Sequence, residues 1–152
     1  MGINEGNTAP IFTLPTADGG TFSLTEALDS GPVVLVFFPF AFSGKCQGEL
    51  CEIRDSFDVF ADAGVQVVGI SCDPGFALDA WAREQGYTFP LASDFWPHGQ
   101  VANAYGVFDA EIGGAKRGSF LIGTDGVVRW SVVNEKTDPR DFSGYREAIA
   151  AL

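Results

Sequence analysis

The sequence predicts an α/β fold in which a central, mixed β-sheet carries helices on both of its faces. Two runs of β-branched and aromatic residues are typical of buried strands, each is followed by a helical pattern, and two further strand patterns near the end are joined by a short turn. Strands that alternate with helices pair in parallel, whereas a short turn joins antiparallel strands. The sheet should therefore be parallel in its middle and antiparallel at one side.

The first predicted strand and helix occupy residues 32–39 and 45–61. The strand reads PVVLVFFP, a continuous apolar run, and Pro39 ends it because proline has no N–H for the strand ladder. The helix is predicted because four apolar residues recur at helical spacing: Leu50, Ile53, Phe57 and Phe60.

The second strand and helix occupy residues 65–73, which read VQVVGISCD, and residues 76–85, which contain Trp81. Residues 117–123 and 126–133 form a predicted hairpin, because the Thr-Asp-Gly sequence that joins them is a turn signal. A last helix carries its apolar residues on one face: Phe142, Tyr145, Ala148, Ile149 and Leu152. This order of strands and helices is that of the thioredoxin-like architecture.

Length, charge and cysteine content limit the classes of function. With 152 residues and 46% hydrophobic content, residues 1–152 should form one compact domain. The formal charge of −11 repels phosphate backbones and anionic lipids, so neither nucleic acid nor a membrane is an expected partner. The N-terminal residues lack the features of a targeting segment, the apolar runs are short, and three cysteines do not suggest a secreted disulfide framework. We expect a cytoplasmic protein.

The stretch FPFAFSGKCQGELC, residues 38–51, places Cys46 just after the predicted strand and in the first turn of the predicted helix. Open α/β sheets bind ligands at this edge, and a helix N-terminus can lower a cysteine pKa from about 8.5 to between roughly 3.5 and 7.5. Gly44 lets the backbone approach a bound group closely. A second interpretation stays open, because a cysteine on the same helical stripe as Leu50 and Ile53 can be a small core residue.

Pro39, Ser43 and Cys46 together form the pattern P-x-x-x-[TS]-x-x-C, and the chain resembles the peroxiredoxins, whose active-site signature this is. The resemblance covers nearly the whole chain. It includes NEGNTAPIFTLPTADGGTFSL near the start, FPLASDFWPHGQVANAYGVFD in the middle, and KRGSFLIGTDGVVRW after it. Within these segments SDFWPHG and AYGVF are most similar to the AhpE type of peroxiredoxin.

This resemblance implies a thiol-dependent peroxidase without cofactor or metal ion, acting on hydrogen peroxide, alkyl hydroperoxides or peroxynitrite. Cys46 would attack the O–O bond as a thiolate and become a sulfenic acid. Ser43, where the family often has threonine, would hydrogen-bond the thiolate or the peroxide, and Pro39 would shield the pocket from water. Arg117 in KRGSF would stabilise the thiolate and hold the peroxide, although an arginine at a strand start is ordinarily a solvated charge. Glu49 is either a carboxylate that orients Arg117 or a solvated helix residue.

Cys51 departs from the AhpE type, which is described as using one cysteine. It stands where the PrxQ branch of the family carries a resolving cysteine, so it is a candidate to form a disulfide with Cys46. Residues five apart in a helix are rotated by about 140° and separated by about 7.5 Å along its axis, too far for a disulfide. The first helical turn would therefore have to unwind. We expect Cys51 to face solvent, because it shares a helix side with polar residues: Gln47, Arg54, Asp55 and Asp58.

Other residues support weaker hypotheses. Three cysteines and His98 lack the paired spacing of a zinc site, and no hydrolase signature supports a dyad of Cys46 with His98, which should instead pack in a turn. Cys72 should be an inert, packed thiol, and Trp81 and Trp96 should be core or interface residues. Two other functions stay open. One is a thioredoxin-like disulfide reductase, which the absence of C-x-x-C argues against, and the other is a non-enzymatic redox sensor or holdase.

The resemblance also implies partners. An external thiol should reduce the oxidised enzyme: a thioredoxin-like protein, a glutaredoxin- or mycoredoxin-like protein, or a low-molecular-weight thiol. A homodimer packed through the aromatic loops around Phe42 and Trp96 is expected as well. The sequence does not select among these reductants.

Overall fold

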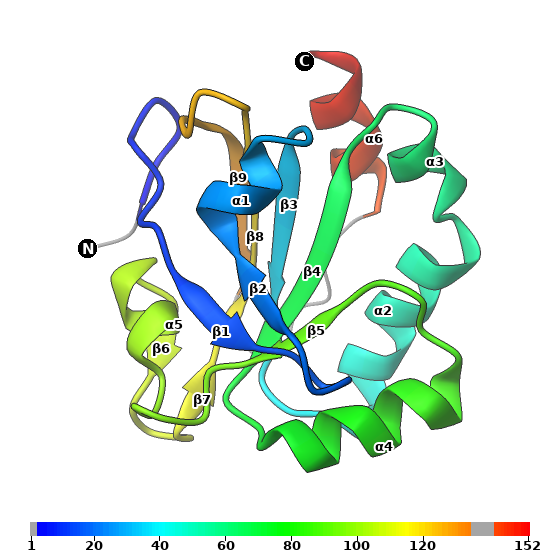
Figure 1. The fold of residues 1–152 in the computed structure, drawn as a ribbon, viewed down its shortest axis with the longest axis vertical. Coiled ribbons are helices and arrows are strands. Elements are labelled where there is room, and N and C mark those ends of the chain that lie inside the picture. The colour runs from blue at the N-terminus through cyan, green and yellow to red at the C-terminus, as the bar shows by residue number, and fades with distance from the viewer. Residues whose placement is uncertain (1–2, 135–141) are drawn as a thin grey trace.

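Five strands form the central sheet (Figure 1): β3 Val33–Phe37, β4 Gln66–Ser71, β5 Leu91–Ser93, β8 Arg117–Ile122 and β9 Val128–Asn134. The computed structural model describes residues 3–134 and 142–152, and only the backbone of residues 45–48. The strand order is β5-β4-β3-β8-β9. Because β3, β4 and β5 are parallel whereas β8 runs antiparallel to both of its neighbours, the predicted mixed sheet is confirmed.

Helices cover both faces of the sheet, because the side chains of the central strand β3 alternate between two cores. Val33, Leu35 and Phe37 belong to one core, and Val34 and Val36 to the other. The first core is covered by α1 (Leu24–Leu28), α5 (Gln100–Ala104) and the hairpin of β1 (Thr13–Pro15) and β2 (Thr21–Ser23). The second is covered by α2 (Gly44–Asp55), α3 (Asp58–Ala61), α4 (Gly75–Gln85) and α6 (Ser143–Ala150).

The single helix predicted for residues 45–61 is wrong, since the segment forms two helices, α2 and α3. Ser56 ends α2 with a backbone outside the helical region (φ −116°, ψ 29°). The bend leaves Phe60 fully buried while Phe57 stacks on Phe89 at 6.3 Å between ring centroids. Packing of two phenylalanines in the core therefore interrupts what the periodicity alone predicts as one helix.

Several short elements have no counterpart in the sequence-based prediction. They are β1, β2, α1, β5, α5, and a small hairpin of β6 (Phe108–Asp109) and β7 (Gly114–Ala115). The longest of them, α1 and α5, have 5 residues each. Such segments are too short for a hydrophobic period to be recognised in the sequence.

The predicted hairpin and helix near the C-terminus are confirmed. β8 and β9 pair with a register shift between Leu121 and Ile122, and Gly126 in their turn has a φ of 79°, which favours glycine. α6 buries Tyr145, but the expectation that Leu152 lies on the same apolar face is wrong, because the helix ends before it and Leu152 is 52% exposed. Within residues 3–134 and 142–152, no helix combines the length and the apolar character that crossing a bilayer requires.

Candidate active site

Cys46 lies in the first turn of α2, at the edge of the sheet where β3 and β4 end (Figure 1). β3 ends at Phe37, and a loop of residues 38–43 leads from it to the helix. The predicted position of Cys46, at a helix N-terminus after a central strand, is confirmed. Its side chain lies outside the described residues. Farther along α2, Leu50 and Ile53 are buried, as their helical spacing predicts.

Pro39 and Ser43 lie near the two ends of this loop. Pro39 is buried against β7, where a Cβ atom added at Gly114 would lie 3.1 Å from the Pro39 carbonyl oxygen. Ser43 is the N-cap residue of α2, with an extended backbone (φ −79°, ψ 134°), and its side chain makes no capping hydrogen bond in the described part of the chain. A hydroxyl that does not cap the helix can turn toward a bound group.

Asp73, which the sequence analysis did not single out, fixes the loop to the sheet. Its Oδ2 accepts hydrogen bonds from the backbone N–H of Ala41 (2.8 Å) and from the Ser71 hydroxyl (2.6 Å). The next loop residue, Phe42, has a φ of 66°, which is rare for a bulky side chain, and its ring centroid lies 6.3 Å from that of Trp81. Asp73 and Trp81 therefore hold the loop in a strained conformation, one through a hydrogen bond and the other through a ring contact. The feature of the sequence that could have indicated Asp73 is its position at the carboxyl end of a predicted central strand.

Arg117 and Glu49 form a buried ion pair. Arg117 Nη1 donates to Glu49 Oε1 at 2.8 Å, and the two residues are only 3% and 9% exposed. The expected contact is therefore present, and the alternative of two solvated charges is wrong. Because Glu49 follows Cys46 by three residues in α2, β8 places the guanidinium of Arg117 beside the N-terminal half of that helix.

Cys51 does not face solvent, so that expectation is wrong. It is half-buried, and its Sγ lies 3.6 Å from Gln85 Oε1 and 3.5 Å from the Tyr87 hydroxyl oxygen. Gln85 is the last residue of α4, which lies beside α2 in Figure 1. The end of α4 and the residues after it therefore cover the side of α2 that its own sequence marks as polar.

Cys72 is a packed thiol, as predicted. It is 3% exposed, and its burial, together with the nearby carboxylates of Asp94 and Asp73, raises the pKa of Cys72 to about 12. A thiol with this pKa stays protonated at neutral pH and is a poor nucleophile.

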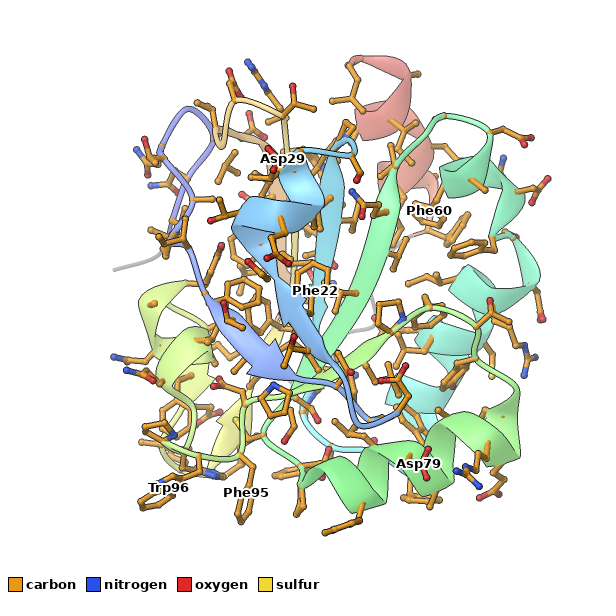
Figure 2. The ribbon with its side chains drawn as sticks, in the orientation of Figure 1. Phe22, Asp29, Phe60, Asp79, Phe95 and Trp96 are labelled. Atoms are coloured by element: carbon orange, nitrogen blue, oxygen red, sulfur yellow. The ribbon has the colours of Figure 1, made fainter. Side chains whose placement is uncertain are left out.

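His98 and Trp81 lie where the sequence places them, and an interface role for Trp96 stays a prediction. His98 packs in an exposed turn, with Nε2 2.6 Å from the carbonyl oxygen of Gly113. Trp81 is fully buried in the core, whereas Trp96 is 78% exposed and projects beside Phe95 at the lower left of Figure 2. Exposed aromatic side chains thus occur both in the loop before α2 and in the turn before α5.

Comparisons with known proteins agree with this geometry. Residues 6–131 match the AhpC/TSA family. The chain is 41% identical to alkyl hydroperoxide reductase E of Mycobacterium tuberculosis (strain ATCC 25618 / H37Rv) over 150 residues, which cover 99% of this chain and 98% of the relative. It is 37% identical to the putative peroxiredoxin bcp of Coxiella burnetii (strain RSA 493 / Nine Mile phase I) over 134 residues, 84% of this chain and 87% of the relative.

Solved structures confirm the thioredoxin-like fold. The crystal structure of peroxidoxin BcpB from Mycobacterium tuberculosis superposes with a TM-score of 0.86 at 33% identity, covering 97% of this chain and 95% of that chain. The names of these relatives indicate peroxide reduction and do not favour a disulfide reductase or a holdase. The chain belongs to the AhpC/TSA family, as a peroxiredoxin of the AhpE type, and is a thiol-dependent peroxidase.

Proposed function

We propose that Cys46 is the peroxidatic cysteine and that Arg117 supplies the positive charge that its reaction needs. The observation that carries this proposal is the buried ion pair of Arg117 with Glu49, which lies three residues after Cys46 in the same helix. A guanidinium held by a carboxylate keeps one orientation, and its five N–H donors allow it to bind a second anion as well. A thiolate at the N-terminal turn of α2 is such an anion.

In the proposed reaction the Cys46 thiolate attacks one oxygen of the peroxide. The S–O bond forms as the O–O bond breaks, and Cys46 is oxidised to a sulfenic acid. The departing group takes up a proton and leaves as water or an alcohol, or it leaves as nitrite when the substrate is peroxynitrite. Arg117 stabilises both the thiolate and the charge that develops on the departing oxygen. Ser43 donates a hydrogen bond to the thiolate or the peroxide, and Pro39 excludes water without offering a competing N–H.

The proposed substrates are hydrogen peroxide, alkyl hydroperoxides and peroxynitrite. The name of the Mycobacterium tuberculosis relative, alkyl hydroperoxide reductase E, supports the alkyl hydroperoxides among them. An external thiol completes the cycle, either a thioredoxin-, glutaredoxin- or mycoredoxin-like protein or a low-molecular-weight thiol. Peroxide turnover measured separately with each class of reductant shows which of them reduces the oxidised enzyme.

We further propose that Cys51 is a resolving cysteine. Its half-buried position and its defined neighbours, Gln85 and Tyr87, support this proposal. A disulfide with Cys46 requires local unwinding of α2, because the two residues lie five positions apart in one helix.

The proposed assembly is a homodimer of 152-residue, single-domain subunits in the cytoplasm. Exposed aromatic residues of the loops on either side of the site support it: Phe40 at 39%, Phe42 at 52%, Phe95 at 45% and Trp96 at 78% exposure. Burial of such side chains favours association. Trp96→Ala should therefore shift the protein toward the monomer in sedimentation velocity, and an unchanged mass distribution would remove Trp96 from the interface.

Replacement of single residues tests the assignment of Cys46 and Arg117. Cys46→Ser should abolish peroxide consumption, whereas Cys72→Ala, the matched cysteine control, should retain it. Arg117→Ala should slow the reaction by a factor of about ten or more, because a hydrogen bond to a charged group contributes about 1.5–3 kcal/mol. Arg117→Lys keeps the charge without the planar donors, and its rate of peroxide reduction should lie between those of Arg117→Ala and the parent. Peroxide turnover by Cys46→Ser at the parent rate would overturn the proposal.

A further inference from the structure

Three residues of α4 and of the segment after it contact the loop before α2 and the sulfur of Cys51. We call them the α4 platform: Trp81, Gln85 and Tyr87. At one end, the Phe42 ring lies 6.3 Å from that of Trp81, and at the other, the sulfur of Cys51 contacts Gln85 and Tyr87. The rings of Trp81 and Tyr87 are themselves in contact, at 5.2 Å between centroids. The loop that enters α2 and the second cysteine therefore rest on one continuous surface.

Two polar groups contact the sulfur of Cys51. The thiol donates to Gln85 Oε1, and the Tyr87 hydroxyl oxygen lies 3.5 Å from the sulfur, where either group can be the donor. When Cys51 loses its proton, the sulfur can only accept, so the Tyr87 hydroxyl then donates to it, whereas the amide oxygen of Gln85 no longer has a partner there. Tyr87 is thus the contact that persists through the reaction of Cys51.

The C-terminal part of α2 is anchored around Cys51. Leu50 and Ile53 on its two sides are 0% and 1% exposed, and Arg54 donates to the backbone carbonyl of Gln85. Unwinding this part would expose two large apolar side chains to water, which is unfavourable. Cys51 should therefore stay on the α4 platform.

Unwinding the first turn of α2 requires less free energy than unwinding its C-terminal part. This turn begins with Gly44, and Gly48 follows at the start of the next turn; glycines lower helix stability because they lose the most backbone freedom on folding. The strained backbone of Phe42, directly before this turn, can relax when the turn opens. If the first turn opens, Cys46 can therefore approach a stationary Cys51.

We propose that Tyr87 is the positioning residue of the resolving step: its hydroxyl holds the sulfur of Cys51 in place while Cys46 moves to it. This inference rests on the proposed role of Cys51. In the step, Cys51 attacks the sulfenic sulfur, the S–S bond forms, the S–O bond breaks, and the hydroxyl leaves with the Cys51 proton as water. The sulfur of Cys51 is oxidised and that of Cys46 is reduced, so the step needs no other reactant.

Tyr87→Phe tests this role, because it removes only the hydroxyl and keeps the ring packed on Trp81 and Phe89. Tyr105→Phe is the matched control, since it removes a hydroxyl that donates to Pro10 on the other side of the sheet. Reduced proteins are mixed with one equivalent of hydrogen peroxide, quenched with N-ethylmaleimide at increasing times, digested and examined by mass spectrometry. Peroxide loss measures the first step, and the peptide linking Cys46 to Cys51 measures the second.

We expect Tyr87→Phe to leave the first step unchanged, to slow disulfide formation about threefold to tenfold, and to increase sulfinic Cys46 at excess peroxide. Tyr105→Phe should match the parent in both steps. Disulfide formation at the parent rate in Tyr87→Phe would overturn the role of Tyr87 while leaving Cys51 as the resolving thiol. Equal slowing of both steps would also overturn it, since the hydroxyl would then be only structural. Absence of the linked peptide in the parent would overturn both the resolving role of Cys51 and this inference.

Discussion

Removing the carboxylate of Glu49 should cost both stability and rate, because it removes the negative charge that pairs with a buried guanidinium. Arg117 and Glu49 are 3% and 9% exposed, with Nη1 and Oε1 2.8 Å apart. Removing one partner of a buried pair typically costs about 3–5 kcal/mol. Glu49→Ala should lower the free energy of unfolding by an amount in this range. Glu49→Gln keeps an oxygen acceptor for the guanidinium and should cost about 1–3 kcal/mol.

Urea unfolding of the reduced proteins, followed by far-UV circular dichroism, measures these differences, and stopped-flow peroxide consumption measures the accompanying loss of rate. Glu52→Ala, at an exposed position of the same helix, is the matched control and should change the free energy of unfolding by no more than about 0.5 kcal/mol. If the free energy of unfolding of Glu49→Ala lay within about 1 kcal/mol of that of this control, the ion pair would behave as a solvated surface pair, and the reasoning would be refuted.

Three further predictions concern residues around the site. Cys72 should resist iodoacetamide in the folded protein at about pH 9, because its pKa is raised to about 12, and labelling as fast as in urea would contradict its burial. Burial raises the pKa of Asp94, so this carboxyl group binds a proton at a higher pH in the folded protein than in the unfolded chain. The stability that this protonation contributes is lost as the pH rises. The parent should therefore gain stability relative to Asp94→Asn when the pH is lowered from about 7 to about 4, and parallel pH curves would contradict this. Gly114→Val should slow peroxide reduction, because its Cβ atom would lie 3.1 Å from the Pro39 carbonyl oxygen, and a parent-like rate would show that the loop tolerates displacement.

The sequence contained enough information to place Cys46 but not its surroundings. The continuous apolar run that became β3 and the helical spacing of Leu50 and Ile53 are local patterns, and they locate Cys46 between strand and helix. The pairing of Glu49 with Arg117 joins residues 68 positions apart, so no local pattern encodes it. Only the resemblance to a family indicated which arginine to consider.

The wrong expectation for Cys51 has a similar cause. A helical wheel compares a residue with its own helix, and the α2 residues on the same side as Cys51 are polar. Its covering residues, Gln85 and Tyr87, come from the end of α4 and the segment after it. Asp73 was missed for the same reason, since the backbone N–H that it binds belongs to Ala41, 32 residues earlier. Contacts between distant segments decide burial at these positions, and sequence periodicity cannot report them.

The identity of the first oxidised cysteine is the most direct test of the proposed reaction. Reduced protein is mixed with less than one equivalent of hydrogen peroxide in the presence of dimedone, which traps sulfenic acids, and each cysteine peptide is examined by mass spectrometry. We predict that the adduct forms on Cys46 and that Arg117→Ala slows its appearance by a factor of about ten or more. An adduct that forms first on Cys51 or Cys72, or one whose rate does not depend on Arg117, would contradict the proposed reaction.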